Sequence, residues 1–433
     1  MGRYFGTDGI RGEAFVTLDQ RFSFRTGYAL SYVLEPTEVI IGMDTRESSI
    51  MIAYSVANGI LARGINVTIA GVVPTPMIAH YSKVKGIIGV MITASHNPYY
   101  DNGIKIFNQG YKTTEKEEYR IEEFIDHGDF LSSGLGKLKL LSDVKEEYLK
   151  IYEKLDLKPM NLNIGFDSAN GANYQIAREL FDLINKNSIQ IKNNPDGVNI
   201  NLNCGSTHLE PILQLVKDKA LDIAFSFDGD GDRIIVIDQN GRVYDGDLLI
   251  YIIGSYLKKK NLLNKDTVVL TKMSNPGLLK ALTDQGISYV LTDIGDKHVF
   301  DALYMNNYTI GGESSGHIIL THLLHTGDGL LVALYLLQIL NELGKSLPEL
   351  IKDVELYPIK QTNLKNINKT VLLKQNVIDK INEIKEKLGK DSLLLVRPSG
   401  TEPLVRITMS SKDEHQINSL TEELINYLKK ESL

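Results

Sequence analysis

Strand-like and helix-like stretches alternate along most of the chain. The strand-like stretches are short apolar runs rich in β-branched residues, at residues 38–43, 66–70, 86–93, 162–167 and 267–271. The helix-like stretches carry apolar residues at helical spacing, at residues 47–63, 171–184 and 277–283. Residues 86–93 are almost wholly apolar, which is typical of a strand buried in a parallel sheet. The alternation predicts an α/β protein built from βαβ units with right-handed crossovers.

A short segment of sequence occurs twice. Residues 41–45 (Ile-Gly-Met-Asp-Thr) resemble residues 164–168 (Ile-Gly-Phe-Asp-Ser), and both lie at the end of a predicted strand. Two interpretations are open. The chain contains copies of one α/β domain, or two unrelated strand ends have converged on similar chemistry.

Polar stretches near residues 142–156, 244–248 and 357–368 mark candidate domain boundaries. The last stretch is rich in Lys and Asn and is typical of a linker. We therefore expect four domains, at residues 1–150, 151–247, 248–360 and 361–433.

The fourth domain differs from the others in pattern. It is predicted to be a smaller α+β module with a helix near residues 376–388, strands at 392–397 and 404–408, and a terminal helix from about His415.

The composition is that of a globular protein, with 43% hydrophobic and 23% charged residues. The net charge of −7 disfavours a protein that coats nucleic acid, so no such partner is expected. Cys204 is the one cysteine, which excludes an intrachain disulfide. The longest apolar run, residues 330–340, is shorter than the roughly 18 residues of a membrane span, and no apolar signal core follows Met1. We expect a cytoplasmic protein with no membrane partner.

The first chemically distinctive loop is residues 93–98 (Thr-Ala-Ser-His-Asn-Pro). It directly follows a buried strand, where α/β proteins bind ligands. Asn97-Pro98 favours a turn over a helix, so Ser95 is expected at a loop tip. Such a serine is either a nucleophile or phosphate carrier, or a capping serine in a tight turn. Lys105 lies ten residues later, on the next predicted strand.

The second loop is residues 228–233 (Asp-Gly-Asp-Gly-Asp-Arg), between two predicted strands. Asp228, Asp230 and Asp232 repel one another unless a cation binds, so we expect a hard divalent cation with oxygen ligands; a solvated acidic turn is the alternative. An EF-hand is excluded, because Arg233 and Gln239 replace its Gly and its final Glu. Arg233 beside a metal suits an anionic substrate.

The third loop is residues 311–317 (Gly-Gly-Glu-Ser-Ser-Gly-His). Glu313 and Ser315 can exchange hydrogen bonds with a polyol; a flexible surface loop is the alternative. His322 and His325 lie nearby, but no further ligand completes a zinc site locally, so none is expected.

The fourth loop is residues 397–403 (Arg-Pro-Ser-Gly-Thr-Glu-Pro), followed by Arg406. Two arginines that bracket a Ser-Gly-Thr turn favour a phosphate-binding nest, with a surface turn as the alternative. The four loops occur in order, one in each predicted domain. Phosphoryl transfer on a phosphorylated sugar is the chemistry that uses all of them.

The motif set resembles that of the α-D-phosphohexomutase family over essentially the whole chain, from residues 5–12 (Phe-Gly-Thr-Asp-Gly-Ile-Arg-Gly) to residues 397–403. The resemblance implies three similar α/β domains with mixed sheets flanked by helices, plus a smaller C-terminal α+β domain, around a central cleft. It also implies that Ser95 is a phosphoserine in the active enzyme. One Mg²⁺ per chain would then be held by Asp228, Asp230, Asp232 and a phosphoserine oxygen of Ser95.

The resemblance also assigns roles to other residues. Arg233 would offset charge on the transferring group, and Lys105 and Arg11 match positions close to the phosphoserine. Lys105 or His317 would serve as general acid or base. Glu313 and Ser315 would bind the sugar hydroxyls of a reorienting 1,6-bisphosphate intermediate. The phosphate that is not reacting would be held by Arg397, Ser399, Gly400, Thr401 and Arg406.

Within the family, the opening motif, Gly400, and residues 199–201 and 204–208 are most similar to the branch that interconverts glucosamine 6-phosphate and glucosamine 1-phosphate. That branch feeds UDP-N-acetylglucosamine and cell-wall precursor synthesis. Ser314 and Lys297 depart from its usual Gln and Arg. A phosphomannomutase/phosphoglucomutase with the same mechanism is therefore an alternative. A phosphosugar phosphatase and a non-catalytic phosphosugar-binding protein are rivals from other classes. A homodimer is compatible with the sequence.

Overall fold

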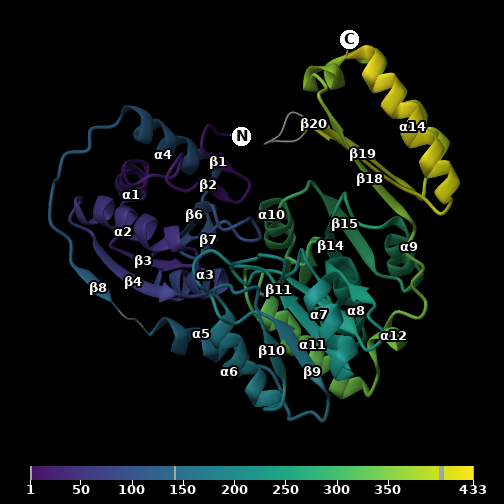
Figure 1. Cartoon of the computed structure of the whole chain (residues 1–433), viewed down its shortest axis with the longest axis horizontal. Coiled ribbons are helices and arrows are strands. Elements are labelled where there is room, and N and C mark those ends of the chain that lie inside the picture. The colour runs from purple at the N-terminus through teal and green to yellow at the C-terminus, as the bar shows by residue number, and fades with distance from the viewer. Residues whose placement is uncertain (1, 141–142, 399–403, 433) are drawn as a thin grey trace.

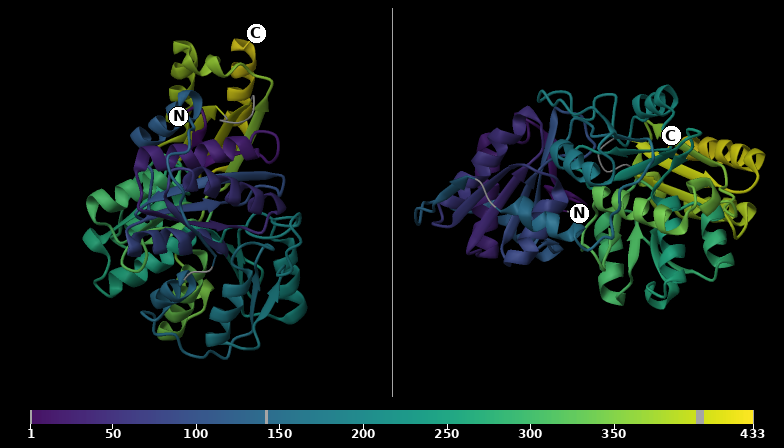
Figure 2. Two further views of the ribbon diagram at one scale, coloured as in Figure 1. Left: turned by 90° about the vertical axis from the view of Figure 1, so that its left-hand side faces the viewer. Right: turned by 90° about the horizontal axis from the view of Figure 1, so that it is seen from below.

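The computed structural model describes residues 2–140, 143–398 and 404–432. Within these residues the strands form four sheets, of eight, five, four and three strands (Figure 1). The sheets follow one another along the chain. Helices pack beside each of them (Figure 2).

The first sheet is the largest. Its strands are β1 (Phe5–Gly6), β2 (Gly9–Glu13), β3 (Glu38–Met43), β4 (Asn66–Val72), β5 (Ile88–Ile92), β6 (Asp101–Asn108), β7 (Tyr111–Lys112) and β8 (Leu138–Leu140). Its helices are α1 (Gln20–Leu34), α2 (Glu47–Leu61), α3 (Thr75–Lys85) and α4 (Glu115–His127). Helix α5 (Val144–Tyr152) leads to the second sheet.

The second and third sheets lie side by side. The second contains β9 (Ile164–Asp167), β10 (Ile189–Ile191), β11 (Ile223–Phe227), β12 (Ile234–Asp238) and β13 (Val243–Tyr244), with helices α6 (Tyr174–Ile184) and α7 (Glu210–Lys219). The third contains β14 (Thr267–Thr271), β15 (Ser288–Thr292), β16 (Ile310–Gly312) and β17 (Ile318–Leu320). Its helices are α8 (Gly246–Lys259), α9 (Pro276–Asp284), α10 (Asp296–Asn306), α11 (Gly329–Leu343) and α12 (Leu347–Leu350), with a 3₁₀ turn at Asn264–Asp266.

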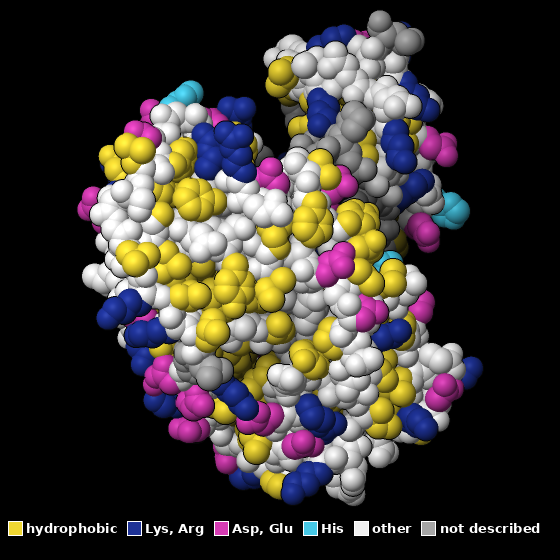
Figure 3. All heavy atoms as spheres, turned by 60° about the vertical axis from the view of Figure 1, so that its left-hand side comes forward, with side chains coloured by type: hydrophobic (Ala, Val, Ile, Leu, Met, Phe, Trp, Pro, Cys, Tyr) yellow, Lys and Arg dark blue, Asp and Glu magenta, His cyan; other side chains and the backbone are white. Residues whose placement is uncertain are grey.

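The fourth sheet is antiparallel and lies at one end of the molecule (Figure 1). Its strands are β18 (Ile359–Lys365), β19 (Leu393–Pro398) and β20 (Leu404–Ser410), with helices α13 (Gln375–Leu388) and α14 (Glu414–Glu431) and a 3₁₀ turn at Lys369–Leu373. In Figure 3 this part forms a lobe separated from the rest by a notch, and Lys and Arg side chains lie on both sides of the notch.

The first three sheets share one four-stranded unit. In each unit the first strand in sequence pairs in parallel with the second and the third, and the third pairs antiparallel with the fourth. The units are β3–β6, β9–β12 and β14–β17. The expected architecture of three similar mixed sheets followed by a smaller α+β unit is confirmed. The shared topology favours repeated copies as the origin of the sequence echo.

The two strands of the echo also end in the same turn. Asp44 Oδ1 accepts a hydrogen bond of 3.0 Å from the backbone N–H of Arg46, and Asp167 Oδ1 accepts one of 2.7 Å from that of Ala169. In both, an aspartate at the end of the first strand of the unit caps the backbone two residues later.

Two expectations about individual elements are corrected. Residues 357–368 are not a linker, because they contain β18, which pairs along its length with β20. Leu364 is the one buried residue of β18. This strand lies at the edge of its sheet, so its sequence is mostly polar and resembles a linker. Strand β5 is parallel to β3 but antiparallel to β6, so the sheet is mixed where the apolar run favoured a parallel one.

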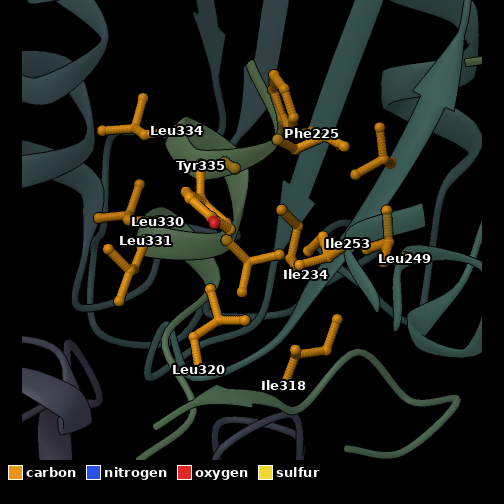
Figure 4. Close-up of a cluster of buried hydrophobic side chains, with 14 of the residues drawn as sticks. Phe225, Ile234, Leu249, Ile253, Ile318, Leu320, Leu330, Leu331, Leu334 and Tyr335 are labelled. Atoms are coloured by element: carbon orange, nitrogen blue, oxygen red, sulfur yellow. The ribbon is translucent and has the colours of Figure 1, made fainter. Parts of the chain in front are cut away.

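The main core joins the second and third sheets. Phe225 and Ile234 from the second sheet meet Ile318 and Leu320 from the third, while α8 and α11 pack between them (Figure 4). Because this core is shared, loops from the two sheets are held in fixed relation. In the described part of the chain, no helix has both the length and the apolar character to cross a membrane.

Candidate active site

The distinctive loops occupy the same place in each repeat. Ser95 lies between β5 and β6, Asp228–Arg233 lie between β11 and β12, and Glu313–His317 lie at the turn from β16 to β17. Each loop therefore joins the third strand of a unit to its antiparallel fourth strand. The structure brings the three loops together.

The hydroxyl of Ser95 points at the acidic loop. Its Oγ donates a hydrogen bond of 2.7 Å to Asp228 Oδ2, and Oγ lies 3.3 Å from Nδ1 of His96. Ser95 is fully buried and has a φ of +52°, in the left-handed region that few non-glycine residues adopt. Strained backbone of this kind clusters at functional sites and persists where neighbouring groups fix it.

The side chains of Arg46 and Asn201 hold the serine loop in place. Arg46 Nη2 donates to the carbonyl oxygens of Ser95 at 3.2 Å and Asn97 at 2.6 Å. Asn201 Nδ2, from the second sheet's domain, donates to the same two carbonyls at 2.9 and 3.0 Å. Arg46 is itself buried and paired with Asp44. The loop is thus held from two sides by side chains of two repeats.

Asp228, Asp230 and Asp232 can converge on one metal ion. One carboxylate oxygen from each lies within 4.8 Å of the others, and all three residues are buried. Among the described residues, Oδ1 of Asp230 and Oδ1 of Asp232 have no hydrogen-bond partner. Burial and the neighbouring carboxylates of Asp232 and Asp230 raise the pKa of Asp228 well above its usual range. Unpartnered buried carboxylate oxygens fit a hard divalent cation, so the predicted donor set suits a metal.

Lys105 reaches into this acidic cluster from β6. Its Nζ lies 2.8 Å from Asp230 Oδ2, 3.3 Å from Asp232 Oδ2 and 3.0 Å from Asp8 Oδ2. Burial would lower the pKa of Lys105, but the carboxylates outweigh burial and hold this pKa well above its usual range. Arg11 is anchored 2.5 Å from Asp8 and donates to Asn97 Oδ1 at 3.4 Å, so it lies beside the serine loop.

His317 and Arg233 connect the second and third loops through an isolated antiparallel bridge. His317 Nδ1 lies 3.6 Å from Asp232 Oδ2, and Nε2 lies 3.8 Å from Asp296 Oδ2. Burial disfavours the charged ring, but Asp232 and Asp296 together raise the pKa of His317 to about 9. The backbone N–H of Arg233 donates to Asp228 Oδ1 at 3.2 Å.

Hydrogen bonds anchor the third loop to neighbouring segments. Glu313 Oε1 accepts a 3.0 Å hydrogen bond from the backbone N–H of Gly295, and Ser315 Oγ is buried without a hydrogen-bond partner in the described residues. The N–H of Gly246, at the start of α8, donates to the carbonyl of Ser314 at 3.1 Å. The ammonium of Lys297 contacts the carbonyl of Thr113 at 3.1 Å and Glu118 at 3.3 Å, so it fastens α10 to the first domain.

In the fourth loop, Arg397 and Arg406 are directly opposite each other on β19 and β20. Burial and Arg406 lower the pKa of Arg397, while the carboxylate of Glu313 opposes this. Ser399, Gly400 and Thr401 lie outside the described residues.

His322 and His325, which were not expected to bind zinc, have local partners. His325 Nε2 lies 2.7 Å from the carbonyl oxygen of Gly110, and the ring of His322 contacts the ring of Tyr335.

Sequence reasoning missed several residues of this site. Asp8, Lys112 and Asp296 join its charged centre, and Arg46 and Asn201 hold the serine loop. Asp8 and Asn201 lie within residues 5–12 and 199–201, motifs whose resemblance to the family and to one branch does not by itself assign these two residues a role. Arg46 directly follows the sequence echo at residues 41–45, in the turn capped by Asp44, and this position was the signal that could have found it.

All four phosphoglucomutase/phosphomannomutase domain families match the chain: domain I at residues 2–132, domain II at 144–241, domain III at 245–357 and the C-terminal domain at 353–426. Phosphoglucosamine mutase of Lactococcus lactis subsp. cremoris is 41% identical over 100% of this chain and 99% of that protein.

The chain belongs to the α-D-phosphohexomutase family. It is an isomerase of that family. Phosphoglucosamine mutase of Streptococcus sanguinis is 39% identical over 100% of this chain and 99% of its own length. Among solved structures, a phosphoglucomutase/phosphomannomutase family protein of Burkholderia thailandensis has a TM-score of 0.83 at 21% identity, covering 98% of this chain and 97% of that one. This last similarity concerns the fold.

Proposed function

We propose that this phosphohexomutase interconverts glucosamine 6-phosphate and glucosamine 1-phosphate through a phosphoserine at residue 95. The observation that carries the proposal is the placement of Ser95 Oγ, buried and 2.7 Å from an oxygen of the acidic triad. The choice of amino sugar is supported by relatives near 40% identity over the whole chain that bear the name phosphoglucosamine mutase.

In the proposed reaction the free hydroxyl of the sugar phosphate attacks the phosphoryl group on Ser95. A new P–O bond forms to the sugar, and the bond from phosphorus to Ser95 Oγ breaks. The result is a sugar 1,6-bisphosphate and a free serine. The bisphosphate reorients, and its other phosphoryl group returns to Ser95. The proton of the attacking hydroxyl passes to a basic group of the site and then to Ser95 Oγ, and the return transfer reverses this. A sugar 1,6-bisphosphate from solution can phosphorylate a free Ser95 in the same way, so it also serves as an activator.

The residues of the chain have separate tasks in this cycle. Mg²⁺ would be held by Asp228, Asp230, Asp232 and an oxygen of phosphorylated Ser95, and when bound it supplies charge neutralisation to the phosphoryl group. Arg233 and Arg11 add cationic charge beside the serine. Lys105 and His317 are the two candidates that exchange the proton of the attacking hydroxyl.

The other proposed contacts hold the sugar ring and the phosphate that is not reacting. Glu313 and Ser315 would bind the sugar hydroxyls in both orientations. Arg397 and Arg406, with Ser399, Gly400 and Thr401, would hold the phosphate that is not reacting.

The test compares kcat/KM for glucosamine 6-phosphate, mannose 6-phosphate and glucose 6-phosphate, each with Mg²⁺ and a sugar 1,6-bisphosphate. We expect glucosamine 6-phosphate to be preferred by at least about tenfold, because a site that hydrogen-bonds one polar group of its substrate discriminates against analogues that lack this group. Preference for a neutral sugar would overturn the proposed substrate. Release of inorganic phosphate faster than isomer formation would show a phosphatase, and the Ser95→Ala variant serves as the inactive control.

A further inference from the structure

Six charged side chains form a closed ring in which acidic and basic groups alternate. Asp8 lies 3.0 Å from Lys105, which lies 3.3 Å from Asp232; Asp232 lies 3.6 Å from His317. His317 lies 3.8 Å from Asp296, Asp296 pairs with Lys112, and Lys112 returns to Asp8 at 2.6 Å. This set is called the charge ring below.

The charge ring joins three repeats. Asp8, Lys105 and Lys112 come from the domain of the first sheet, and Asp232 comes from the loop between β11 and β12 of the second. His317 and Asp296 come from the β16–β17 turn and from helix α10 of the third. Its side chains are between 3% and 23% exposed, so water screens them weakly. Because acidic and basic groups alternate, removal of one leaves its two neighbours, which are of the same kind, without their shared partner.

Lys112 and Asp296 close the ring between Asp8 and His317. Each nitrogen of the His317 ring faces one carboxylate, Nδ1 toward Asp232 and Nε2 toward Asp296. Two anchors at opposite sides of an imidazole fix its rotation. Lys112 in turn holds Asp296 and Asp8 together, and Asp8 contacts both Lys105 and Arg11.

We propose that Lys112 and Asp296 are positioning residues for phosphoryl transfer, holding His317 and Lys105 in register through the charge ring. The proposal rests on the proposed function, because it assigns these residues to the same reaction. Neither residue contacts Ser95 or the acidic triad in the described contacts, so both act through their neighbours.

A simple fastening role is the competing explanation, and the chain contains a control for it. The pair Lys297–Glu118, at 3.3 Å, crosses the same junction between the first and third domains, one residue from Asp296. It is not part of the charge ring. Glu118→Gln therefore removes a comparable fastening without changing the ring.

The first experiment measures kcat, KM and Tm for Asp296→Asn, Lys112→Met and Glu118→Gln in the full-length chain with Mg²⁺. We expect the two ring variants to lower kcat on the order of 10- to 100-fold with KM changed less than about threefold. Glu118→Gln should keep kcat within about twofold of the starting enzyme, since it leaves the ring intact. The conservative variants Asp296→Glu and Lys112→Arg should recover most of kcat.

The second experiment exchanges the charges in the double variant Lys112→Glu/Asp296→Lys. The exchange keeps an ion pair between the two positions, but places Glu beside Asp8 and Lys beside His317. If the pair only fastens domains, the exchange restores kcat. We expect kcat to stay as low as in the single variants, because alternation around the ring is lost.

A third measurement separates this proposal from the choice of substrate. The rate at which glucose 1,6-bisphosphate phosphorylates Ser95, followed by intact mass, requires no particular product sugar. We expect this rate to fall in Asp296→Asn and Lys112→Met and to be retained in Glu118→Gln. Equal losses in all three variants, full kcat in both ring variants, or recovery in the exchanged pair would each overturn the proposal. Absence of turnover of glucosamine 6-phosphate by the starting enzyme would instead overturn the proposed substrate.

Discussion

Asn201 shows how a residue remote in sequence controls the position of the serine. Its amide donates to the carbonyls of Ser95 and Asn97, which belong to another repeat. The backbone of Asn201 has a φ of +57°, a conformation that glycine also adopts readily. Asn201→Gly therefore removes the amide with little backbone strain.

We expect Asn201→Gly to lower kcat roughly tenfold, because the strained serine loop loses two of its anchors. Asn203→Gly is the matched control. Asn203 lies in the same loop, is exposed and has a φ of +49°. Steady-state kinetics on both variants provide the measurement. Equal kcat values would show that Arg46 alone holds the loop.

The acidic triad predicts a response to metal removal. In the absence of a cation its buried carboxylates repel one another, so binding of Mg²⁺ should stabilise the folded chain. We expect Mg²⁺ to raise the Tm of the chelator-treated protein and to restore its turnover. Asp230→Asn should lose both effects, whereas Asp222→Asn, which changes an exposed carboxylate before β11, should keep them. A metal-induced Tm shift that persists in Asp230→Asn would contradict the assigned ligands.

Asp247 predicts a pH dependence of stability away from the site. Burial, and then the charge of Asp245, raises the pKa of Asp247 to about 7. A raised carboxyl pKa means that folding favours the protonated form. Its contribution is complete below the unfolded pKa of about 4 and is lost as the pH rises through about 7. Asp247→Asn should therefore have a Tm that falls less than that of the unaltered chain between these pH values. An equal fall of Tm in Asp247→Asn and in the unaltered chain would contradict the role assigned to Asp247.

At the scale of elements, the start of α8 sets the position of the third loop. A Cβ at Gly246 would lie 2.0 Å from the carbonyl oxygen of Glu313, so Gly246→Ala must push the loop away. We expect KM for the sugar phosphate to rise about tenfold, since Glu313 is the proposed sugar ligand. Gly254→Ala, in the same helix, meets a methyl group of Val268 at 3.0 Å and should change KM little. An unchanged KM in folded Gly246→Ala would show that the position of the third loop does not affect binding of the sugar phosphate.

The predictability of each element follows from how local its signal is. The strands of the repeats and the loops at Ser95 and Asp228–Arg233 could be predicted because one short run of sequence contains the whole pattern. Strand β18 could not, because an edge strand with one buried side chain has no apolar alternation. Lys112 and Asp296 could not either, because they meet across 184 residues and only the packing of the first domain against the third pairs them.

At the scale of the whole molecule, three copies of one unit each place a different chemical group at the same turn. The repeats face a common centre, so a serine, an acidic triad and a Glu/His loop converge without any of them being close in sequence. The net charge of −7 is a property of the whole chain, whereas at this centre Lys105, Arg11 and Arg233 each lie beside an aspartate, so cationic and acidic groups are interleaved. The domain limits at 150, 247 and 360 stay predictions.

The phosphoserine at residue 95 is tested most directly by intact-mass analysis of the purified chain, with peptide mapping of the modified site. After incubation with a sugar 1,6-bisphosphate and Mg²⁺, we expect one phosphoryl group per chain, located on Ser95. If that phosphoryl group is isotopically labelled, the label should pass from Ser95 to the sugar phosphates when glucosamine 6-phosphate is added, and Ser95→Ala should never acquire it. A chain that turns over its substrate while Ser95 remains unmodified under these conditions, or that carries the phosphoryl group on another residue, would contradict the proposed mechanism.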